Sequence, residues 1–360
     1  MKNVELKKRR LGKTNLLVTE LGFGAMNIPS VSDGAETLSR ALDLSINFVD
    51  SARIYRGSEY LIGDVMNGRD RRDCYLATKT ISRSADGVQH DIDRSLSLLR
   101  VDRIDLYQLH DVREDDWEKV IGKGGALEGL ERARSRGLID HVGISSHSQD
   151  VIKKVVAGDL FETLQVDYSA YNPIMAHFVL QAKQKDIGVI VMKPLGGAGR
   201  VGSIGSSEYK GWISAKALLH YLLSDSNISV AIPGARFVWE VEELVELAHS
   251  YESMTALQRA FCEAEAKFLT DQGAYECRGC RYCTEGKEVC RADINIAEIL
   301  TRFHNVANLI DEKLLSHDYQ SYKRCNPTGI DCIGCGDCEE LCPFSLSIMT
   351  LIDEIDRRLS

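Results

Sequence analysis

Polar side chains of types that transfer protons stand at the ends of three successive apolar segments of the sequence. Asp50 follows the segment 47–49, and Tyr55 comes five residues later. Lys79 ends a second segment, and His110 ends a third. A polar group buried without a partner costs about 2–7 kcal/mol, so carboxylates and phenols at successive strand ends are poor core residues. The four side chains, called the quartet below, predict a site for proton transfer.

The quartet suits the reduction of a carbonyl group by hydride, which needs a proton donor and a group that holds the carbonyl oxygen. A phenol has an ordinary pKa of about 10, and a nearby Lys79 cation would lower the pKa of Tyr55 by favouring phenolate. Asp50 would keep Lys79 charged, and His110 would donate a hydrogen bond to the substrate. Tyr55 is the expected general acid, or general base in oxidation. The structural alternative is an Asp50–Lys79 ion pair with His110 at a strand end.

Eight short apolar segments alternate with helical patterns between residues 18 and 250. Eight strands, each followed by a helix, predict an α/β fold, a closed (β/α)8 TIM barrel with its chemistry at the carboxyl ends of the strands. An open doubly wound sheet would normally have fewer strands and a glycine-rich first turn, which is absent here. The expected strands are Val18–Gly24, Asn47–Asp50, Cys74–Lys79, Ile104–Leu109, His141–Ser145, Thr163–Asp167, Gly188–Lys193 and Ile228–Pro233, and helices are expected at Ala35–Leu44, Val88–Leu99, Gly125–Arg136, Val179–Lys185, Ser214–Leu223 and Glu240–Ser250.

The composition, with 44% hydrophobic and 27% charged residues, is that of a globular protein, and a net charge of −9 without a basic stripe argues against nucleic-acid binding. No secretory signal or membrane-spanning run is apparent, so a cytoplasmic protein is expected. Eleven cysteines are present, but only Cys74 precedes Cys262. Such clustering favours metal binding over disulfides in a reducing compartment. We therefore expect a barrel at residues 1–254, and at 255–360 a linking helix and a second domain.

Residues 10–250 resemble the aldo-keto reductase family, because the quartet matches its catalytic residues in type, order and strand position. The resemblance implies NADPH or NADH as the hydride donor and a small carbonyl or alcohol as the substrate. Shorter matches are Leu11-Gly12-Lys13-Thr14, Leu109-His110, Gly143-Ile144-Ser145-Ser146, Tyr171-Asn172-Pro173, Pro194-Leu195-Gly196 and Ile232-Pro233-Gly234.

The resemblance also implies coenzyme contacts. Ser145, Ser146 and Gln165 match the positions that hold the nicotinamide carboxamide, although Ser146 replaces the more usual Asn. Met192 stands where many members stack a tyrosine on the ring, and its sulfur can pack there; the alternative is a core residue. Further contacts are implied at Gly24, Ala25, Met26, Pro194, Leu195, Gly197, Ile232, Gly234, Arg236, Glu240 and Glu243.

The segment expected to meet the adenosine end leaves the choice of coenzyme open. Gly234 and Glu240 stand where NADPH-preferring members often carry Lys and Arg. Glu240 would repel a 2′-phosphate and could accept hydrogen bonds from ribose, whereas the guanidinium of Arg236 suits phosphate. Residues 196–207 are rich in Gly and Ser, so this segment is either a loop that closes over the pyrophosphate or a plain connection.

The second cysteine run, Cys332-x2-Cys335-x2-Cys338-x3-Cys342-Pro343, matches the bacterial four-iron ferredoxin pattern. The first run has the same two steps, but its fourth cysteine follows after six residues. In two-cluster ferredoxins the fourth cysteine of each run serves the other cluster. Zinc also binds four thiolates, but usually from separated C-x2-C pairs. We expect two [4Fe-4S] clusters, held by Cys277, Cys280, Cys283 and Cys342, and by Cys332, Cys335, Cys338 and Cys290, with Cys325 as an alternative to Cys290.

Residues 294–310 and 346–359 show helical periodicity, as in α-helical ferredoxin modules. The whole chain therefore resembles the aldo-keto reductases that carry a C-terminal ferredoxin-like domain. Three functions remain open: a carbonyl–alcohol oxidoreductase whose clusters exchange electrons with a protein partner, the same enzyme with structural or redox-sensing clusters, and a non-catalytic nucleotide-binding module. The intact quartet argues against the third.

Overall fold

The computed structural model of the chain describes residues 6–196, 214–271, 276–277, 283, 290–307, 311–326, 331–342, 344 and 346–360. The chain divides into two compact units, Met1–Pro194 with Leu219–Met254, and Leu195–Leu218 with Thr255–Ser360. The predicted coenzyme contact Gly197, the cluster ligand Cys280 and most of the loop predicted at 196–207 lie outside the described residues. No helix among the described residues is long and apolar enough to cross a membrane.

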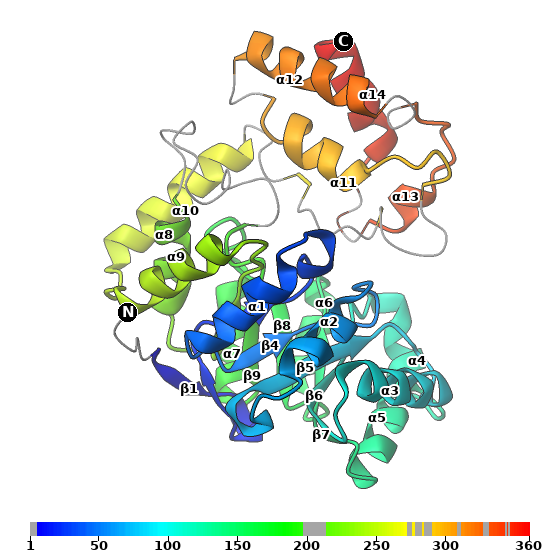
Figure 1. Ribbon diagram of the computed structural model, residues 1–360, viewed down its shortest axis with the longest axis vertical. Helices are drawn as coiled ribbons and strands as arrows, with labels where there is room; N and C mark the ends of the chain where they lie inside the picture. Colours follow the sequence, from blue (N-terminus) through cyan, green and yellow to red (C-terminus); the bar gives the residue numbers. More distant parts are fainter. Residues whose placement is uncertain are drawn as a thin grey trace. The chain divides into compact units, whose positions relative to one another are not determined.

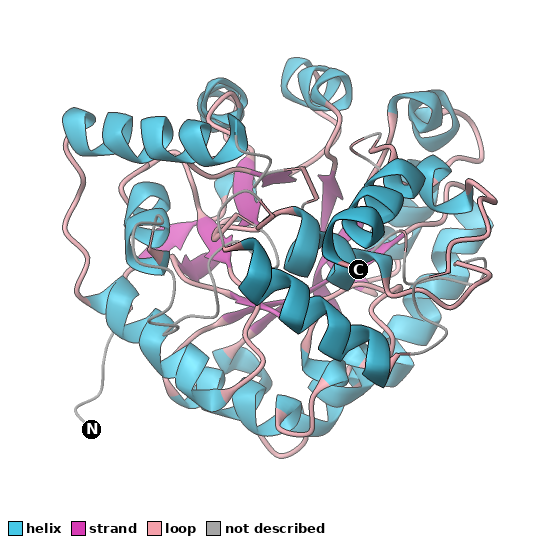
Figure 2. Ribbon diagram, turned by 90° about the horizontal axis from the view of Figure 1, so that it is seen from above, coloured by secondary structure: helices cyan, strands magenta, loops and turns pink. Residues whose placement is uncertain are grey.

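The first unit contains a sheet of eight parallel strands in the order β10-β9-β8-β7-β6-β5-β4-β3, which confirms the predicted barrel. Bridges between Leu21 and Ala231, and between Gly24 and Gly234, join its two edges. Helices surround the strands (Figure 2). The strands are β3 (Phe23–Gly24), β4 (Phe48–Asp50), β5 (Tyr75–Thr80), β6 (Ile104–Leu109), β7 (Ile139–Ser145), β8 (Thr163–Asp167), β9 (Gly188–Met192) and β10 (Val230–Ile232).

The first predicted strand, 18–24, is wrong in its extent. Residues 17–19 instead form β2 (Leu17–Thr19), which pairs antiparallel with β1 (Lys8–Arg10). The side chain of Asn47 holds this hairpin: its Oδ1 accepts a hydrogen bond from Thr19 N at 2.6 Å, and its Nδ2 donates to Leu17 O at 2.9 Å. Only β3, two residues long, enters the barrel.

Helices with one apolar face follow the barrel strands. Capping side chains fix several of their starts: Ser84 accepts a hydrogen bond from Gly87 N at the start of α3, and Ser148 accepts one from Val151 N at the start of α6. Such caps define where each loop ends. The helices are α1 (Gly34–Asp43), α2 (Ser58–Met66), α3 (Ala85–Leu99), α4 (Trp117–Ile121), α5 (Ala126–Ser135), α6 (Gln149–Ala157), α7 (Met175–Gln184), α8 (Ala215–Leu223) and α9 (Val238–His249).

An apolar layer fills the barrel interior and sets the direction of the next residues along each strand. Phe48, Ala77 and Leu106 belong to this buried cluster. Because strand side chains alternate between faces, the residues two positions further on, Asp50, Lys79 and Gln108, point inward as well. Each of these strands therefore contributes an apolar side chain to the barrel core and, two residues later, a polar side chain to a layer nearer its carboxyl end.

The second unit is helical in its described parts (Figure 1). Its core includes Phe303, whose ring centroid lies 4.9 Å from that of Tyr319. Its helices α12 and α14 are joined by a hydrogen bond from Ser316 Oγ to Leu359 O at 2.9 Å. The helices are α10 (Ala256–Asp271), α11 (Ile296–Ile299), which continues as a π-helical turn at Leu300–His304, α12 (Glu312–Cys325), α13 (Asp337–Glu340) and α14 (Ile348–Leu359). This arrangement by itself does not identify a ferredoxin fold, and the domain limits 1–254 and 255–360 remain predictions.

Candidate active site

The quartet converges at the carboxyl ends of three adjacent strands. Asp50 ends β4, Lys79 lies near the end of β5, and His110 directly follows β6. All three are buried, with exposed fractions of 2%, 0% and 3%. Tyr55 lies on the loop between β4 and α2 and is half-buried. The structure therefore brings the four predicted side chains to one place.

A buried ion pair forms the base of this site. Lys79 Nζ lies 2.6 Å from Asp50 Oδ2 and also donates to Ser51 O at 2.6 Å. Burial lowers the pKa of Lys79, and the neighbouring Asp50 charge opposes that shift. Burial likewise raises the pKa of Asp50, opposed by Lys79. Each charge therefore depends on the other to remain ionised away from water.

Gln108 and Gln165 support the ion pair in the same inward layer. Gln108 Nε2 donates to Gln165 Oε1 at 2.9 Å and lies 3.4 Å from Asp50 Oδ1. Gln165 also hydrogen-bonds to Asp50, which lowers the pKa of that carboxyl against the larger effect of burial. Gln165, predicted as a carboxamide contact, is thus engaged in holding the quartet. Gln108 was not identified from the sequence.

Tyr55 and His110 face one another above the ion pair. Their ring centroids are 5.7 Å apart at an interplanar angle of 89°. Lys79 Nζ lies 5.3 Å from the centroid of the Tyr55 ring. Burial, together with the charge of Lys79, holds the pKa of His110 well below its ordinary 6.5. His110 is therefore neutral near pH 7 and can donate one N–H to a carbonyl oxygen.

A buried network holds the loop that carries Tyr55. Arg53 on this loop forms an ion pair with Glu59 in the first turn of α2. The other carboxylate oxygen of Glu59 accepts hydrogen bonds from Thr78 and Ser95, each at 2.7 Å. Glu59 is only 2% exposed, so the pair is largely shielded from solvent. This support was not predicted from the sequence, although Glu59 follows Tyr55 by four residues.

The two serines predicted to hold the carboxamide differ in their use. Ser145 Oγ accepts a hydrogen bond from Asp111 N at 3.0 Å, which leaves its hydroxyl proton able to donate. Ser146 Oγ donates to Val112 O at 2.6 Å and accepts from Ser148 N at 3.0 Å. The hydroxyl of Ser146 therefore already donates to one backbone group and accepts from another. Ser145 fits a nicotinamide carboxamide better.

Other predicted coenzyme contacts line the seam where the barrel closes. Met192 ends β9, pairs in register with Ile232 and packs against the barrel interior. A Cβ on Gly24 would lie 2.9 Å from Ile232 O, so glycine is needed there for closure. Ala25 N donates to Asp50 O at 2.8 Å, which ties this seam to the quartet. Gly234, Met26 and Pro194 lie in the adjoining loops, and Leu195 belongs to a segment grouped with the second unit.

The segment predicted to meet the adenosine end begins with a helix cap that the sequence did not indicate. Glu240 is buried, and its Oε2 accepts hydrogen bonds from the backbone N–H groups of Arg236 (2.6 Å) and Phe237 (3.2 Å). It therefore caps the start of α9, in the manner of a capping-box glutamate. Arg236 keeps about half of its side chain exposed, with its guanidinium 3.8 Å from Glu240. Glu243 is half-buried, and burial together with Glu246 and Glu240 raises its pKa.

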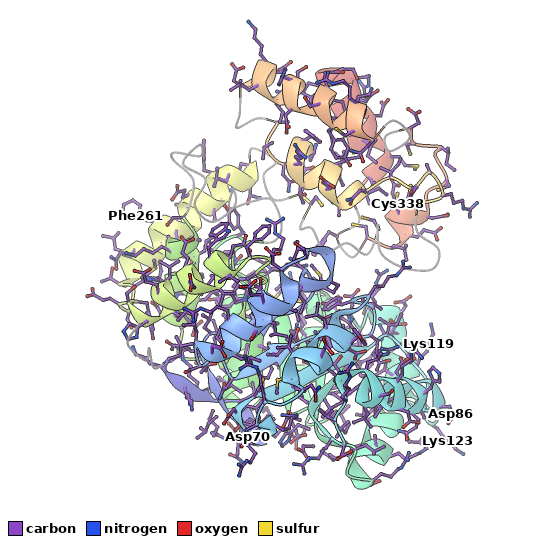
Figure 3. All side chains as sticks on the ribbon, in the orientation of Figure 1. Asp70, Asp86, Lys119, Lys123, Phe261 and Cys338 are labelled. Carbon is purple, nitrogen blue, oxygen red and sulfur yellow. The ribbon has the colours of Figure 1, made fainter. Side chains whose placement is uncertain are left out.

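The described cysteines of the second unit lie partly in its core and partly on an exposed loop. Cys338, on α13 (labelled in Figure 3), has its pKa raised to about 11 by burial, Glu339 and the charges of Cys290 and Cys332. Cys290 packs against the same core as Cys338, and Cys332 and Cys335 lie in the loop before α13. Gly334 and Gly336 have φ of +70° and +82°, in the left-handed region that glycine adopts easily. Cys325 ends α12 and is exposed.

The first cysteine run is described only in part. Cys277 and Cys283 are buried, and they pack in the core of the second unit together with Cys342. Within the described residues, no group of three or more His, Cys, Asp or Glu side chains is arranged to hold a metal ion. Thiolates at these spacings are typical ligands of iron-sulfur clusters. The described cysteines therefore supply the right kind of ligand atom, and Cys280 lies outside the described residues.

Comparisons with known proteins identify the family of the barrel. The model of the Aldo/keto reductase family matches residues 20–251. The oxidoreductase YqkF of Bacillus subtilis is 31% identical over 206 residues, covering 53% of this chain and 65% of that protein. L-galactose dehydrogenase of Arabidopsis thaliana is 28% identical over 307 residues, covering 74% and 95%. The holo form of aldo-keto reductase AKR11C1 from Bacillus halodurans superposes with a TM-score of 0.63 at 25% identity, covering 72% and 96%.

Proposed function

The chain belongs to the aldo/keto reductase family and is an NAD(P)-dependent oxidoreductase of that type, and from this premise we propose that Tyr55 is its general acid and general base. The substrate is a small molecule with a carbonyl group or the corresponding alcohol. The observation that carries the proposal is the buried Lys79–Asp50 pair, with its ammonium 5.3 Å from the centre of the Tyr55 ring. A cation so placed favours the phenolate and makes Tyr55 a usable acid.

Each member of the quartet has one task in this proposal. A bound nicotinamide coenzyme supplies or accepts the hydride. Neutral His110 donates a hydrogen bond to the carbonyl oxygen, and Tyr55 gives that oxygen its proton as negative charge develops. Lys79 stabilises the phenolate that remains, and Asp50 keeps Lys79 charged and in position. Oxidation of an alcohol reverses these proton transfers.

Residues around the barrel mouth fit the coenzyme. Ser145 would hold the carboxamide and Met192 would pack on the nicotinamide ring through its sulfur. Arg236 would meet the adenosine phosphate, since its guanidinium is half-exposed. NADPH is typical of the family, and NADH remains a candidate because Glu243 adds negative charge on α9, which begins two residues after Arg236.

The experiment is coenzyme oxidation, followed at 340 nm, with NADPH and NADH against a panel of aldehydes, ketones and oxidised sugars. The name of the Arabidopsis relative, L-galactose dehydrogenase, supports including sugars. We expect at least one carbonyl to be reduced with a kcat/KM of about 10⁴ M⁻¹s⁻¹ or more, the lower end of the usual range for enzymes. Coenzyme binding without turnover of any carbonyl or alcohol would support the non-catalytic alternative.

We also propose that residues 255–360 form a ferredoxin-like domain with two [4Fe-4S] clusters that exchange electrons with a protein partner. The packing of Cys290 against the core that contains Cys338 supports Cys290, rather than exposed Cys325, as the fourth ligand of one cluster. The burial of Cys277 and Cys283 in the core of the unit supports the alternative that the other cluster is structural.

The visible spectrum of anaerobically purified protein, before and after addition of NADPH or NADH, tests this part. A broad iron–sulfur band that bleaches on addition would establish an electron path between coenzyme and clusters. A band that does not change would make the clusters structural or sensory. Zinc in place of iron would overturn the cluster proposal and leave the barrel proposal intact.

A further inference from the structure

A second chain of buried polar side chains crosses the same mouth of the barrel, beside the quartet. With Nδ1 protonated, His147 donates to Asp111 Oδ1 at 2.8 Å, and its Nε2 accepts from Lys193 Nζ at 2.8 Å. Lys193 Nζ also lies 3.8 Å from Asp167 Oδ2. The side chains of Asp111 and His147 are 7% and 5% exposed. Four strand ends, those of β6, β7, β8 and β9, are thereby linked.

The two ends of this chain are neighbours of residues with proposed roles. Asp111 directly follows His110, and Lys193 directly follows Met192. Asp111 also fixes Ser145, because its backbone N–H donates to Ser145 Oγ at 3.0 Å. Any movement of His147 would therefore be transmitted both to the group that holds the substrate oxygen and to the residues proposed around the nicotinamide.

The backbone at both ends is held in an unusual conformation. Asp111 has φ of +46° and Lys193 has φ of +53°. Among the described residues other than glycine with positive φ, only these two lie within two residues after the carboxyl end of a barrel strand. Residues other than glycine rarely adopt a positive φ unless the surrounding structure stabilises it, and those that do concentrate at functional sites. The hydrogen bonds to His147 supply that support from both sides.

We propose that His147 is a positioning residue for the reduction: in its neutral form it holds Asp111 and Lys193, and through them it aligns His110 with Met192 across the nicotinamide. The inference rests on the proposed function of the barrel. Neutral His147 bridges an anion and a cation, whereas protonated His147 cannot accept from Lys193 and would face it with like charge. The bridge therefore opens when His147 is protonated.

The sign of the pH effect follows from the surroundings of His147. Burial, together with the charge of Lys193, lowers its pKa from 6.5, against the raising effects of Asp111 and Asp167. The neutral form thus persists to below pH 6.5, and kcat/KM falls as the pH drops through the lowered pKa. The charged and titratable groups around this ring are His110 and Asp111 after β6, with Arg113 paired to Asp111, Asp167 at the end of β8 and Lys193 after β9.

Three variants test the proposal with 4-nitrobenzaldehyde and NADPH as the probes, over pH 5 to 8. His147→Gln keeps a donor and an acceptor but does not titrate, so we expect the acidic fall in kcat/KM to disappear. Lys193→Met removes the cation that lowers the pKa, so the fall should move toward pH 6.5. His147→Ala should lower kcat/KM by about tenfold to a hundredfold at every pH, because misplacement of reacting groups has effects of this size.

His141→Gln is the matched control. His141 lies on the same strand, β7, and its Nδ1 pairs with Glu162 at 3.0 Å, but it stands toward the opposite end of the barrel. This variant should keep the wild-type pH profile. An acidic fall that persists unchanged in His147→Gln would assign it to another group, such as His110, and overturn the proposal.

A separate readout distinguishes this inference from the function on which it rests. Failure of wild-type protein to reduce any carbonyl would refute the proposed function. The pKa of His147, followed by NMR of labelled imidazole rings and assigned with His147→Gln, would still test the bridge. We expect that pKa to rise in Lys193→Met, and an unchanged pKa would contradict the bridge whatever the activity.

Discussion

The quartet and the cysteine loops differ in what holds their functional side chains. In the barrel, Lys79 and Asp50 are buried and hydrogen-bonded to protein groups before any ligand arrives. In the second unit, Cys332 and Cys335 are exposed on a loop that turns at two glycines. The first site is complete as a protein structure, whereas the proposed cluster site would be completed only by bound metal.

This difference shows which interactions order the functional side chains of each site. Preorganised groups in a buried site need little rearrangement during the reaction, which is a main source of catalysis. Thiolate loops are ordered by the metal itself, so metal binding there contributes to folding free energy. We therefore expect the barrel to respond to changes of single charges and the second unit to respond to loss of iron.

The largest effect is expected from Lys79→Met, which would break the preformed site. It leaves Asp50 buried without its cation, a change that costs about 3–5 kcal/mol of stability. Loss of assistance to the general acid should lower kcat/KM by roughly 10²–10⁴-fold. Urea unfolding and steady-state kinetics measure the two effects. Lys153→Met is the control, because Lys153 pairs with Asp150 at the exposed surface and should change neither.

A second prediction concerns the cysteine loops. Cys338→Ser should remove one of two clusters, so the iron content measured by plasma spectroscopy should fall by about half. The reduction of a carbonyl by the barrel should continue, since no member of the quartet depends on iron. Cys325→Ser is the control and should keep all iron. Loss of iron in that variant instead would make Cys325 a ligand.

The smallest effect tests the coenzyme preference within the barrel. Arg236→Ala removes a guanidinium from the proposed phosphate site, and a charged hydrogen bond of about 1.5–3 kcal/mol corresponds to at least a tenfold rise in KM. The rise should appear with NADPH and not with NADH. An equal change for both coenzymes would mean that Arg236 does not meet the 2′-phosphate.

The quartet could be predicted because it depends on local features. Asp50, Lys79 and His110 stand at the ends of apolar segments, and a parallel barrel brings such ends to one face. The first barrel strand was predicted too long, because residues 17–19 are apolar enough for a strand but are held in a hairpin by Asn47. Apolarity alone does not say which partner a strand takes.

Other features depend on contacts between distant loops and could not be read from spacing. Helix α12 was not predicted, since its burial depends on Phe303 and α14 rather than on a strongly apolar face. The ribose contact predicted for Glu240 remains a prediction, and the sequence did not indicate that its Oε2 caps α9 by accepting from two backbone N–H groups. His147 passed unnoticed because its partners come from two other strand ends.

The most direct test of the central claim is the rate of coenzyme oxidation by Tyr55→Phe with the best carbonyl found for the wild type. The substitution removes only the phenolic hydroxyl and leaves the Lys79–Asp50 pair in place. The account predicts that kcat falls by about 10²–10⁴-fold, while the Kd for NADPH or NADH, measured by fluorescence, changes less than about threefold. Turnover equal to that of the wild type would contradict Tyr55 as the general acid.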